Sequence, residues 1–371
     1  MHLCIVSLNA YKSISGCAAG QIGGVELQTS LLARWMAQKG HAVSLVTWDE
    51  GGPREEFFDR VRVVKICGQR QGIPGFRFFH PKWTSLVRVL RSINADVYYQ
   101  NGAENLTGQT AMWCGKNGKR FVFVAASNMD CIKNLPELKN PRDRFLYLYG
   151  LRHADRVIVQ TRTQKEMMND NFGVGASVVP MPCPDITVDA SVVHESAVSD
   201  RILWVGRVCR VKRPHLILDL AERRPDLQFD IVGPVYGDSY AQNVHRRGQT
   251  LENVAFHGGI SKGKMFFFYS RALCLCCTSE IEGFPNTFLE AWSSRLPVVS
   301  TYDPDGVIKQ HELGFFEQDV DGLERCIDLL RKDTGVYERI SRNARNYFLE
   351  HHEADKILEK FECIFNELAK R

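Results

Sequence analysis

Residues 273–301 read LCLCCTSEIEGFPNTFLEAWSSRLPVVST, and this stretch decides the fold class. The apolar runs Ala272–Cys277 and Pro297–Ser300 have the length of buried strands, and the segment between them is typical of a loop followed by a helix. Two carboxylates lie there at a fixed spacing: Glu282 in the loop, and Glu290 eight residues later in the predicted helix. Strand, helix and strand in this order are the unit from which parallel sheets are built.

The loop between the two acids has the composition of a ligand-binding turn. Glycine tolerates a positive φ and close approach, and proline near a helix start loses no needed donor. The N–H groups at the start of the predicted helix Pro285–Ser294 form an anion site. Acid, anion-binding turn and second acid indicate a ligand with hydroxyls and phosphates, such as a nucleotide sugar. The residues concerned are Glu282, Gly283, Phe284, Pro285, Asn286, Thr287 and Glu290.

Strand-like and helix-like runs alternate along the whole chain. The first half has predicted strands at 2–8, 42–47, 95–100, 119–126 and 154–160, and predicted helices at 23–39 and 164–171. The second half adds predicted strands at 201–205, 228–232 and 254–256, and a predicted helix at 214–223. This βαβ rhythm predicts a parallel sheet in each half.

The best linker is the polar segment 182–200, which has little helical periodicity. We therefore expect an N-terminal Rossmann-like domain over 1–185, a linker over 186–200, and a second Rossmann-like domain over 201–345. A C-terminal helix over 346–371 is expected to pack back on the first domain. Such sheets bind ligands outside the carboxyl ends of their strands, so two of them imply a cleft between the domains.

The composition excludes several classes of protein. The chain has 371 residues, 44% of them hydrophobic and 24% charged, as in ordinary globular proteins. No apolar run reaches the roughly 18 residues of a membrane-spanning helix, and the first residues lack the basic start of a signal peptide. The twelve cysteines are scattered along the chain. We expect them to be buried structural thiols rather than ligands of a metal cluster. These features predict a cytoplasmic protein.

The charge is divided unevenly. Residues 1–185 carry 23 Lys and Arg against 15 Asp and Glu, and residues 186–371 carry 24 against 28. The first half is therefore expected to meet something anionic. Its basic and aromatic segment 74–91 has two interpretations: a face that docks on an anionic membrane or holds an anionic acceptor, and an ordinary loop and helix with inward apolar side chains. No nucleic-acid partner is expected, because the excess of basic over acidic residues is modest and no recognition motif for nucleic acid is present.

A second group of candidates follows the predicted strand Arg201–Val205. Gly206, Arg207 and Lys212 lie just past its carboxyl end. Two cations there can clamp a diphosphate and stabilise a nucleoside diphosphate as leaving group. Alone, this segment is also typical of a solvated basic turn, and its combination with the two acids favours a binding site.

Together, the two groups resemble a known family. Gly206-Arg207 with Lys212, followed by Glu282-Gly-Phe-Pro and Leu289-Glu290-Ala, is similar to the donor-binding half of the retaining glycosyltransferases of the GT-B fold. Family 4 (glycosyl transferases group 1) is the nearest match. Weaker similarities are at Gly23-Gly24, 154–161, 256–258 and 296–299. The resemblance implies an α/β fold of the GT-B type, with two Rossmann-like, doubly wound domains that face each other across a cleft.

The resemblance implies a role for each matching residue. Arg207 and Lys212 would hold the donor diphosphate and, with Glu282, carry the catalysis. Glu290 would accept hydrogen bonds from the ribose hydroxyls, and Glu282 would bind sugar hydroxyls near the transferred carbon. His257 is expected to be structural or base-adjacent rather than catalytic. The remaining donor-side candidates are Gly23, Gly24, Gly206, Gly283, Phe284, Pro285, Asn286 and Thr287.

The acceptor side departs from the family pattern. Many relatives have a histidine after a first-domain strand, whereas residues 98–104 and 122–130 contain none. The acceptor-side candidates are Asn101, Ser127, Asn128 and Asp130. Neither a metal nor another cofactor is expected, because the family neutralises the diphosphate with cations and helix dipoles.

The sequence therefore predicts a retaining hexosyltransferase. It would move a sugar from a nucleoside-diphosphate sugar to a glycan or lipid-linked acceptor in cell-surface polysaccharide or glycolipid biosynthesis, peripheral at the inner face of the membrane. Two alternatives stay open: a nucleotide-sugar epimerase on the same fold, and a non-catalytic protein that binds sugar nucleotides or glycans.

Overall fold

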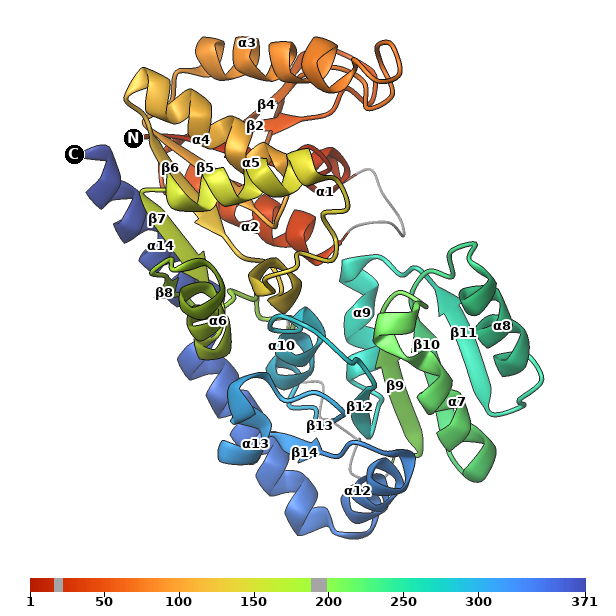
Figure 1. The fold of residues 1–371 in the computed structure, drawn as a ribbon. Coiled ribbons are helices and arrows are strands. Elements are labelled where there is room, and N and C mark those ends of the chain that lie inside the picture. Colours follow the sequence, from red (N-terminus) through yellow and green to blue (C-terminus); the bar gives the residue numbers. More distant parts are fainter. Residues whose placement is uncertain (17–22, 188–198) are drawn as a thin grey trace. The chain divides into compact units, whose positions relative to one another are not determined.

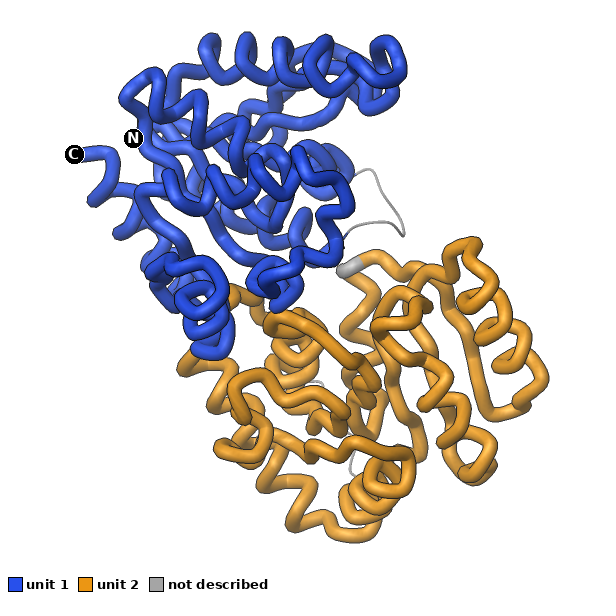
Figure 2. Tube along the Cα trace, viewed as in Figure 1, with its two compact units in different colours: residues 1–18, 22–180, 355–371 blue, residues 19–21, 181–354 orange. Residues whose placement is uncertain are grey.

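The structure, a computed structural model, describes residues 1–16, 23–187 and 199–371. These residues form two compact units, which Figure 2 shows in two colours. Unit 1 contains residues 1–16, 23–180 and 355–371, and unit 2 contains residues 181–187 and 199–354. Each unit is a parallel sheet with helices on both faces (Figure 1), which is the doubly wound α/β architecture that the sequence predicts.

The sheet of unit 1 has eight strands within the described residues, in the order β3-β4-β2-β1-β5-β6-β7-β8. All neighbours are parallel except β3 and β4. Its strands are β1 (His2–Val6), β2 (Ala42–Thr47), β3 (Glu55–Phe58), β4 (Val61–Lys65), β5 (Val97–Asn101), β6 (Arg120–Val124), β7 (Arg156–Val159) and β8 (Ser177–Val178). Its helices are α1 (Tyr11–Ser15), α2 (Gly24–Gln38), η1 (Phe78–Trp83), α3 (Thr84–Ile93), α4 (Asn105–Asn117), η2 (Asn128–Cys131), α5 (Pro141–Arg152), α6 (Arg162–Phe172) and α14 (Ala354–Ala369).

The antiparallel hairpin of β3 and β4 was not predicted from the sequence. Its two-residue turn, Asp59 and Arg60, has positive φ angles of 47° and 68°. A turn with positive φ at both central residues matches the twist of paired strands. The signal in the sequence was the alternation of charged and apolar residues after Asp59, in Arg60-Val61-Arg62-Val63.

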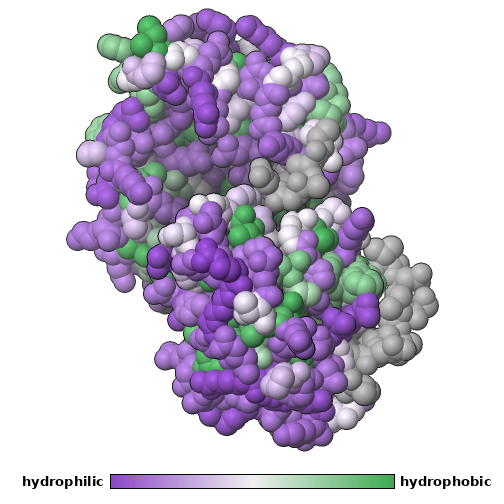
Figure 3. Space-filling model, turned by 90° about the vertical axis from the view of Figure 1, so that its right-hand side faces the viewer, coloured by the Kyte–Doolittle hydropathy of each residue, from purple (hydrophilic) through white to green (hydrophobic). Residues whose placement is uncertain are grey.

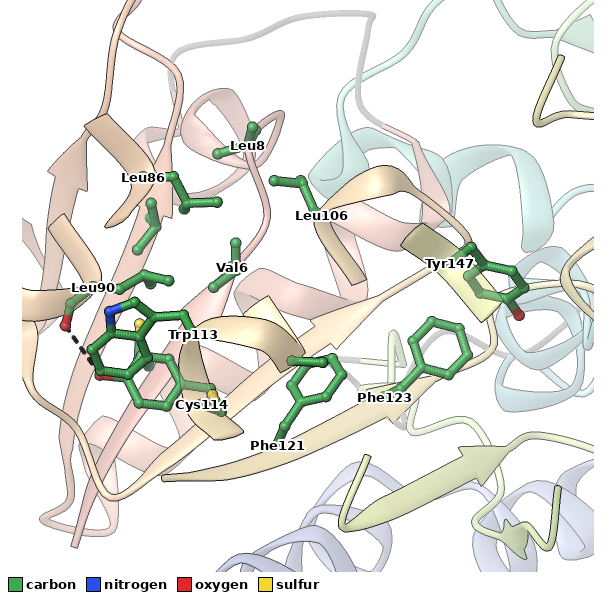
Figure 4. Close-up of a cluster of buried hydrophobic side chains, with 14 of the residues drawn as sticks. Val6, Leu8, Leu86, Leu90, Leu106, Trp113, Cys114, Phe121, Phe123 and Tyr147 are labelled. Atoms are coloured by element: carbon green, nitrogen blue, oxygen red, sulfur yellow. Dashed lines mark hydrogen bonds between the residues drawn. The ribbon is translucent and has the colours of Figure 1, made fainter. Parts of the chain in front are cut away.

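One hydrophobic core of unit 1 joins strands and helices from distant parts of the sequence (Figure 4). Val6 comes from β1, Leu86 from α3, Trp113 from α4 and Phe123 from β6, and each is buried. The Tyr98 hydroxyl, inside this core, donates to the carbonyl of Leu90 at 3.2 Å. The apolar stripe of α3 thus packs inward, as the ordinary interpretation of residues 84–91 expected.

Helices α4 and α5 touch backbone to backbone. A Cβ atom on Gly108 of α4 would overlap the carbonyl of Leu146 in α5, and one on Gly150 of α5 would overlap the backbone of Thr107. Two glycines therefore allow a closer approach than side chains permit. The contact joins the first turns of α4, which Asn105 begins, to the middle and last turns of α5.

The sheet of unit 2 has six parallel strands within the described residues, in the order β11-β10-β9-β12-β13-β14. Its strands are β9 (Arg201–Val205), β10 (Gln228–Val232), β11 (Val254–Gly258), β12 (Cys274–Cys277), β13 (Val298–Ser300) and β14 (Gly314–Phe316). Its helices are η4 (Arg210–Lys212), α7 (Pro214–Arg223), α8 (Ser239–Gly248), α9 (Lys262–Tyr269), α10 (Asn286–Ser293), η5 (Pro304–Gly306), α11 (Val307–Gln310), α12 (Val320–Lys332) and α13 (Thr334–His351). Apolar clusters cover both faces of the sheet. Cys274, Cys276 and Cys277 are buried in β12.

The units divide at other residues than the sequence suggested. Residues 181–185 belong to unit 2 rather than to the first domain, because Met181 and Cys183 pack in a core cluster of unit 2. The expected boundary after residue 345 falls inside α13. Helix α14 belongs to unit 1, where Phe365 packs edge-on against Tyr99 of β5 at 6.0 Å between ring centroids. Most of the linker expected over 186–200 lies outside the described residues.

Within the described residues, no helix is both long and apolar enough to cross a bilayer. On the face in Figure 3, hydrophilic side chains prevail and apolar ones occur in small separate groups.

The contact between α4 and α5 makes opposite predictions for two glycines of the same helix. Gly108→Ala should lower the free energy of unfolding by at least ~2 kcal/mol, because the methyl group overpacks the interface. Gly115 of α4 is exposed and has open space around its Cβ position, so Gly115→Ala should raise stability by about 0.5–1 kcal/mol. Chemical denaturation of both variants measures the difference, and equal effects would contradict the close contact.

Candidate functional site

Unit 2 brings together two predicted residues that lie 70 positions apart. Lys212 ends η4, just past the carboxyl end of β9, and Glu282 follows the neighbouring strand β12. The Lys212 ammonium donates to Glu282 Oε1 and forms an ion pair with it. Both side chains are partly buried. The pair places a cation and a carboxylate at the ligand-binding edge of this sheet.

A network of hydrogen bonds holds these two segments against each other. Arg213 adopts φ 45°, and its guanidinium donates to the carbonyl of Thr278 and the hydroxyl of Thr301, both at 2.8 Å. The Thr278 hydroxyl donates to the carbonyl of Lys212 at 2.7 Å. Arg213 was not among the predicted site residues, although it directly follows Lys212. Its bonds fix the turn that carries Lys212.

Glu290 lies in α10, where its carboxylate accepts a hydrogen bond from the Tyr269 hydroxyl at 2.7 Å. Tyr269 ends α9 and is fully buried. Burial and the adjacent carboxylate raise the pKa of Tyr269 well above its usual value, which keeps the hydroxyl protonated as a donor. Tyr269 was not predicted as a site residue, because only the tertiary fold brings it next to Glu290.

Aromatic side chains pack against the turn between Glu282 and Glu290. Phe284 is buried, with its ring 4.6 Å from that of His352 and 6.0 Å from that of Trp292. The Tyr302 hydroxyl contacts the carbonyl oxygens of Glu282 and Gly283, at 3.2 Å each. Gly283 and Pro285 are buried as well, and Asn286 and Thr287, in the first turn of α10, are partly exposed. The backbone of this turn is thus held rigidly at the sheet edge.

Three further predicted residues lie on the β9–β11 side of the sheet. The Gly206 N–H donates to the carbonyl of Val232 at 2.9 Å, and Arg207 is exposed beside it. His257 lies in β11, where its Nε2 is 2.7 Å from Asp230 Oδ1 and its ring packs edge-on against Phe268. The role of His257 in the site stays a prediction.

Unit 1 holds the remaining candidates. Gly23 is the extended N-cap residue of α2 and Gly24 begins the helix, and both are exposed. The other four follow two neighbouring strands, with Asn101 ending β5 and residues 127–130 after β6. Asn128 begins η2 and is partly buried. The two groups thus share one unit.

Asp130 and Ser127 have contacts that shape their own loop. The Asp130 carboxylate is buried and accepts from the N–H groups of Ala126 at 2.7 Å and Ser127 at 3.2 Å. Ser127 accepts from the N–H of Met129 at 3.0 Å. Burial raises the pKa of Asp130 to about 6.

Glu104 is a titratable group that sequence analysis did not select. It is the N-cap residue of α4 and forms a capping box with Thr107. Burial raises the pKa of Glu104 to about 7, against an opposing effect of Lys82 and with smaller contributions from Glu26 and Asp130. Four charged groups from separate segments therefore act on one another at the carboxyl edge of this sheet.

Among the residues that the structure describes, no group of three or more His, Cys, Asp or Glu side chains is arranged to hold a metal ion. The predicted charged residues at the unit 2 site are Arg207, Lys212, Glu282 and Glu290, and the structure adds Arg213.

Two glycosyltransferase family profiles match this chain, one in each half. The profile described as Glycosyltransferase Family 4 matches residues 22–183, and that described as Glycosyl transferases group 1 matches residues 194–347. The chain therefore belongs to the glycosyltransferases of the GT-B fold. Both the fold class and the family that the sequence indicated are confirmed.

Individual relatives are distant. The Escherichia coli "O-antigen biosynthesis glycosyltransferase WbnH" is 27% identical over 99 residues, which cover 27% of this chain and 28% of that protein. The Campylobacter jejuni "GalNAc-alpha-(1->4)-GalNAc-alpha-(1->3)-diNAcBac-PP-undecaprenol alpha-1,4-N-acetyl-D-galactosaminyltransferase" is 24% identical, with 87% of this chain and 89% of that protein covered. The structure of sucrose-phosphate synthase from Thermosynechococcus elongatus has a TM-score of 0.80 and 16% identity, with 99% of each chain covered, which shows a shared fold.

The raised pKa of Glu104 predicts a pH-dependent stability. The folded chain keeps a proton that the unfolded chain releases between about pH 4.5 and 7, so this residue lowers the free energy of unfolding as pH rises through that window. Glu104→Gln keeps an acceptor for the cap and removes the charge. Its stability relative to wild type should rise by on the order of 1–2 kcal/mol between pH 5 and 8.

Urea denaturation at a series of pH values measures this difference. Glu137 is exposed in the same unit, so Glu137→Gln is the matched control and should show no such rise. A flat difference for Glu104→Gln would show that Glu104 is ionised in the folded chain throughout.

Proposed function

We propose that this chain transfers a hexose-type sugar from a nucleoside-diphosphate sugar to a glycan or lipid-linked acceptor, with retention of configuration. The observation that carries the proposal is the Lys212–Glu282 pair at the carboxyl edge of the unit 2 sheet, with the Glu290 carboxylate held by Tyr269 on the helix that follows. These are the charges that a sugar, a diphosphate and a ribose require.

Each residue has a chemical role in this proposal. Lys212 and Arg207 neutralise the diphosphate as the sugar departs, which is electrostatic stabilisation of the leaving group. Glu282 holds the Lys212 ammonium in place and offers its carboxylate to sugar hydroxyls. Tyr269 orients the Glu290 carboxylate, which accepts hydrogen bonds from the ribose diol. No metal or cofactor is needed in this scheme, because the two cations balance the developing charge.

Retention follows if the acceptor hydroxyl attacks from the face that the diphosphate leaves. The departing phosphate oxygen then accepts the proton of that hydroxyl, the bond from the sugar carbon to the phosphate oxygen breaks, and the new glycosidic bond forms. This route needs no covalent sugar–enzyme intermediate and hence no paired carboxylates at the spacing of a retaining glycosidase.

The acceptor class is suggested by relatives. One is described by its name as an O-antigen biosynthesis enzyme, and the name of another includes an undecaprenol-linked glycan. We propose a role in cell-surface polysaccharide or glycolipid synthesis at the cytoplasmic side of a membrane. The cysteines among the described residues are free thiols, as expected in a reducing compartment.

The donor site predicts specific losses. Glu290→Ala should weaken binding of the nucleoside-diphosphate sugar about ten-fold or more, because two hydrogen bonds to a carboxylate are lost. Lys212→Ala should slow diphosphate release about 100-fold. Glu338, exposed on α13 of the same unit, supplies the control Glu338→Ala, which should behave as wild type. Calorimetry and diphosphate release with a panel of donors measure both effects, and the anomer of the product tests retention.

Other outcomes would select another function. No binding of any donor would refute the proposal. Turnover without an acceptor that yields an isomerised sugar would identify an epimerase, and tight binding without transfer to any acceptor would identify a binding protein.

We propose further that unit 1 contacts an anionic membrane. Ile73, Phe76 and Phe79 expose 71%, 70% and 54% of their surface. The first two lie on the loop before η1, and Phe79 lies in η1, which leads to α3. Arg88 and Arg91 are exposed on α3. Apolar side chains beside cations favour partition into an anionic interface.

This contact is tested by co-sedimentation with liposomes. Phe76→Ser together with Phe79→Ser should reduce binding to anionic vesicles about ten-fold. Phe145 is equally exposed, at 62%, on α5 of the same unit, so Phe145→Ser should leave binding unchanged. Equal binding to neutral and anionic lipid, or an equal loss in the control, would refute the contact.

A further inference from the structure

Unit 1 contains a cavity of about 270 Å³ at the carboxyl edge of its sheet. Trp48 directly follows β2 and Asn105 directly begins α4, after β5. This is the edge at which doubly wound sheets bind ligands. Ligand pockets commonly measure about 300–1,000 Å³, so the cavity suits a single sugar ring or a charged substituent rather than a longer glycan.

The lining of the cavity is cationic and contains no acid among the described residues. Arg77, Lys82 and Arg142 contribute three positive side chains, and all three are partly buried. The Lys82 ammonium donates to Asn105 Oδ1 at 2.9 Å. Burial lowers the pKa of Lys82, which is the cost of holding a cation in this lining, and the charges of Glu104 and Asp143, which lie outside the lining, offset only part of it. A bound anion would relieve that cost.

Two aromatic rings line the cavity. Trp48 and Phe78 are 8% and 6% exposed. The Lys82 ammonium lies 5.4 Å from the centroid of the Trp48 ring, and the Arg142 guanidinium lies 3.5 Å from the centroid of the Phe78 ring. Stacking on the rings holds both cations in defined positions. Arg142 is also paired with Asp143 at 2.9 Å, which orients its guanidinium further.

This combination selects for an acidic sugar. An arginine fork binds a carboxylate or a phosphate through two parallel hydrogen bonds, and a lysine adds a point charge. Aromatic faces next to the cations offer contact to the apolar side of a sugar ring. A neutral sugar would leave three cations without an added partner.

We propose that this cavity binds an acidic group, a carboxylate or a phosphate monoester, on the sugar residue of the acceptor that lies in unit 1. The inference rests on the proposed transfer function and narrows it to acidic acceptors. It uses Arg77, Lys82 and Arg142 rather than the exposed apolar side chains that the membrane contact uses.

The test compares three probes on the full chain: glucuronate, glucose 6-phosphate and glucose. Calorimetry or ligand-observed NMR should show binding of one or both anionic probes at least about ten-fold tighter than of glucose, with loss of the preference at high salt. Lys82→Met and Arg142→Met should each weaken anion binding about ten-fold or more. Arg152, exposed on the same helix as Arg142, gives the control Arg152→Met, which should bind as wild type.

Donor binding by unit 2 is measured on the same variants, so that a folding defect and a failure of the transfer proposal can be told apart. Unchanged donor affinity together with lost anion affinity supports the cavity. Equal affinity for glucose and for both anions, or full anion binding by Lys82→Met and Arg142→Met, overturns it whatever the donor result. A third outcome is that the wild type binds none of the three probes, and that Lys82→Met and Arg142→Met lose binding to anionic vesicles. In that case the cavity serves a lipid headgroup, and the acceptor proposal is wrong.

Discussion

Parallel strands bring all their carboxyl ends to one edge of a sheet, and the candidate sites of both units depend on this constraint. In unit 2 it sets the turn after β9 beside the loop after β12, although Lys212 and Glu282 lie far apart in the sequence. In unit 1 it sets the segments after β2, β4, β5 and β6 along one edge. Loops that are unrelated in sequence become neighbours because hydrogen bonding fixes the order of the strands.

Strand order alone does not position a side chain, and each unit adds its own device. In unit 2 the Arg213 guanidinium bridges carbonyl and hydroxyl groups from two loops, so the turn with Lys212 has one position. In unit 1 the glycine contact between α4 and α5 sets how closely the two helices pack. The first of these contacts holds Arg213 at a positive φ, and the second requires glycine, because a side chain there would overlap the backbone of the other helix.

The two candidate sites differ in how they balance charge. The donor site pairs Lys212 with a carboxylate and Glu290 with a tyrosine hydroxyl in the unliganded chain. In the cavity of unit 1, Lys82 lies over the Trp48 ring and donates to the Asn105 amide, whereas Arg142 stacks on Phe78 and is also paired with Asp143. An anion that reaches Lys82 adds to its ring and amide contacts, whereas a ligand of Lys212 must displace the Glu282 carboxylate.

The fold class, the family and the strongly periodic strands and helices could be predicted from the sequence, because a strand buried in a parallel sheet must be an apolar run and the loop after it must carry turn residues. Glu282 and Glu290 were indicated by their spacing, and Lys212 by its place just past a predicted strand. It missed the β3–β4 hairpin, whose pattern is short, and placed the unit boundaries inside α13 and before residue 186. The contact of Tyr269 with Glu290, the bonds by which Arg213 fixes the turn of Lys212, and the cavity that Trp48, Lys82 and Arg142 line became apparent in the folded chain alone. Contacts between distant segments depend on packing and strand order, and neither leaves a local signal in the sequence.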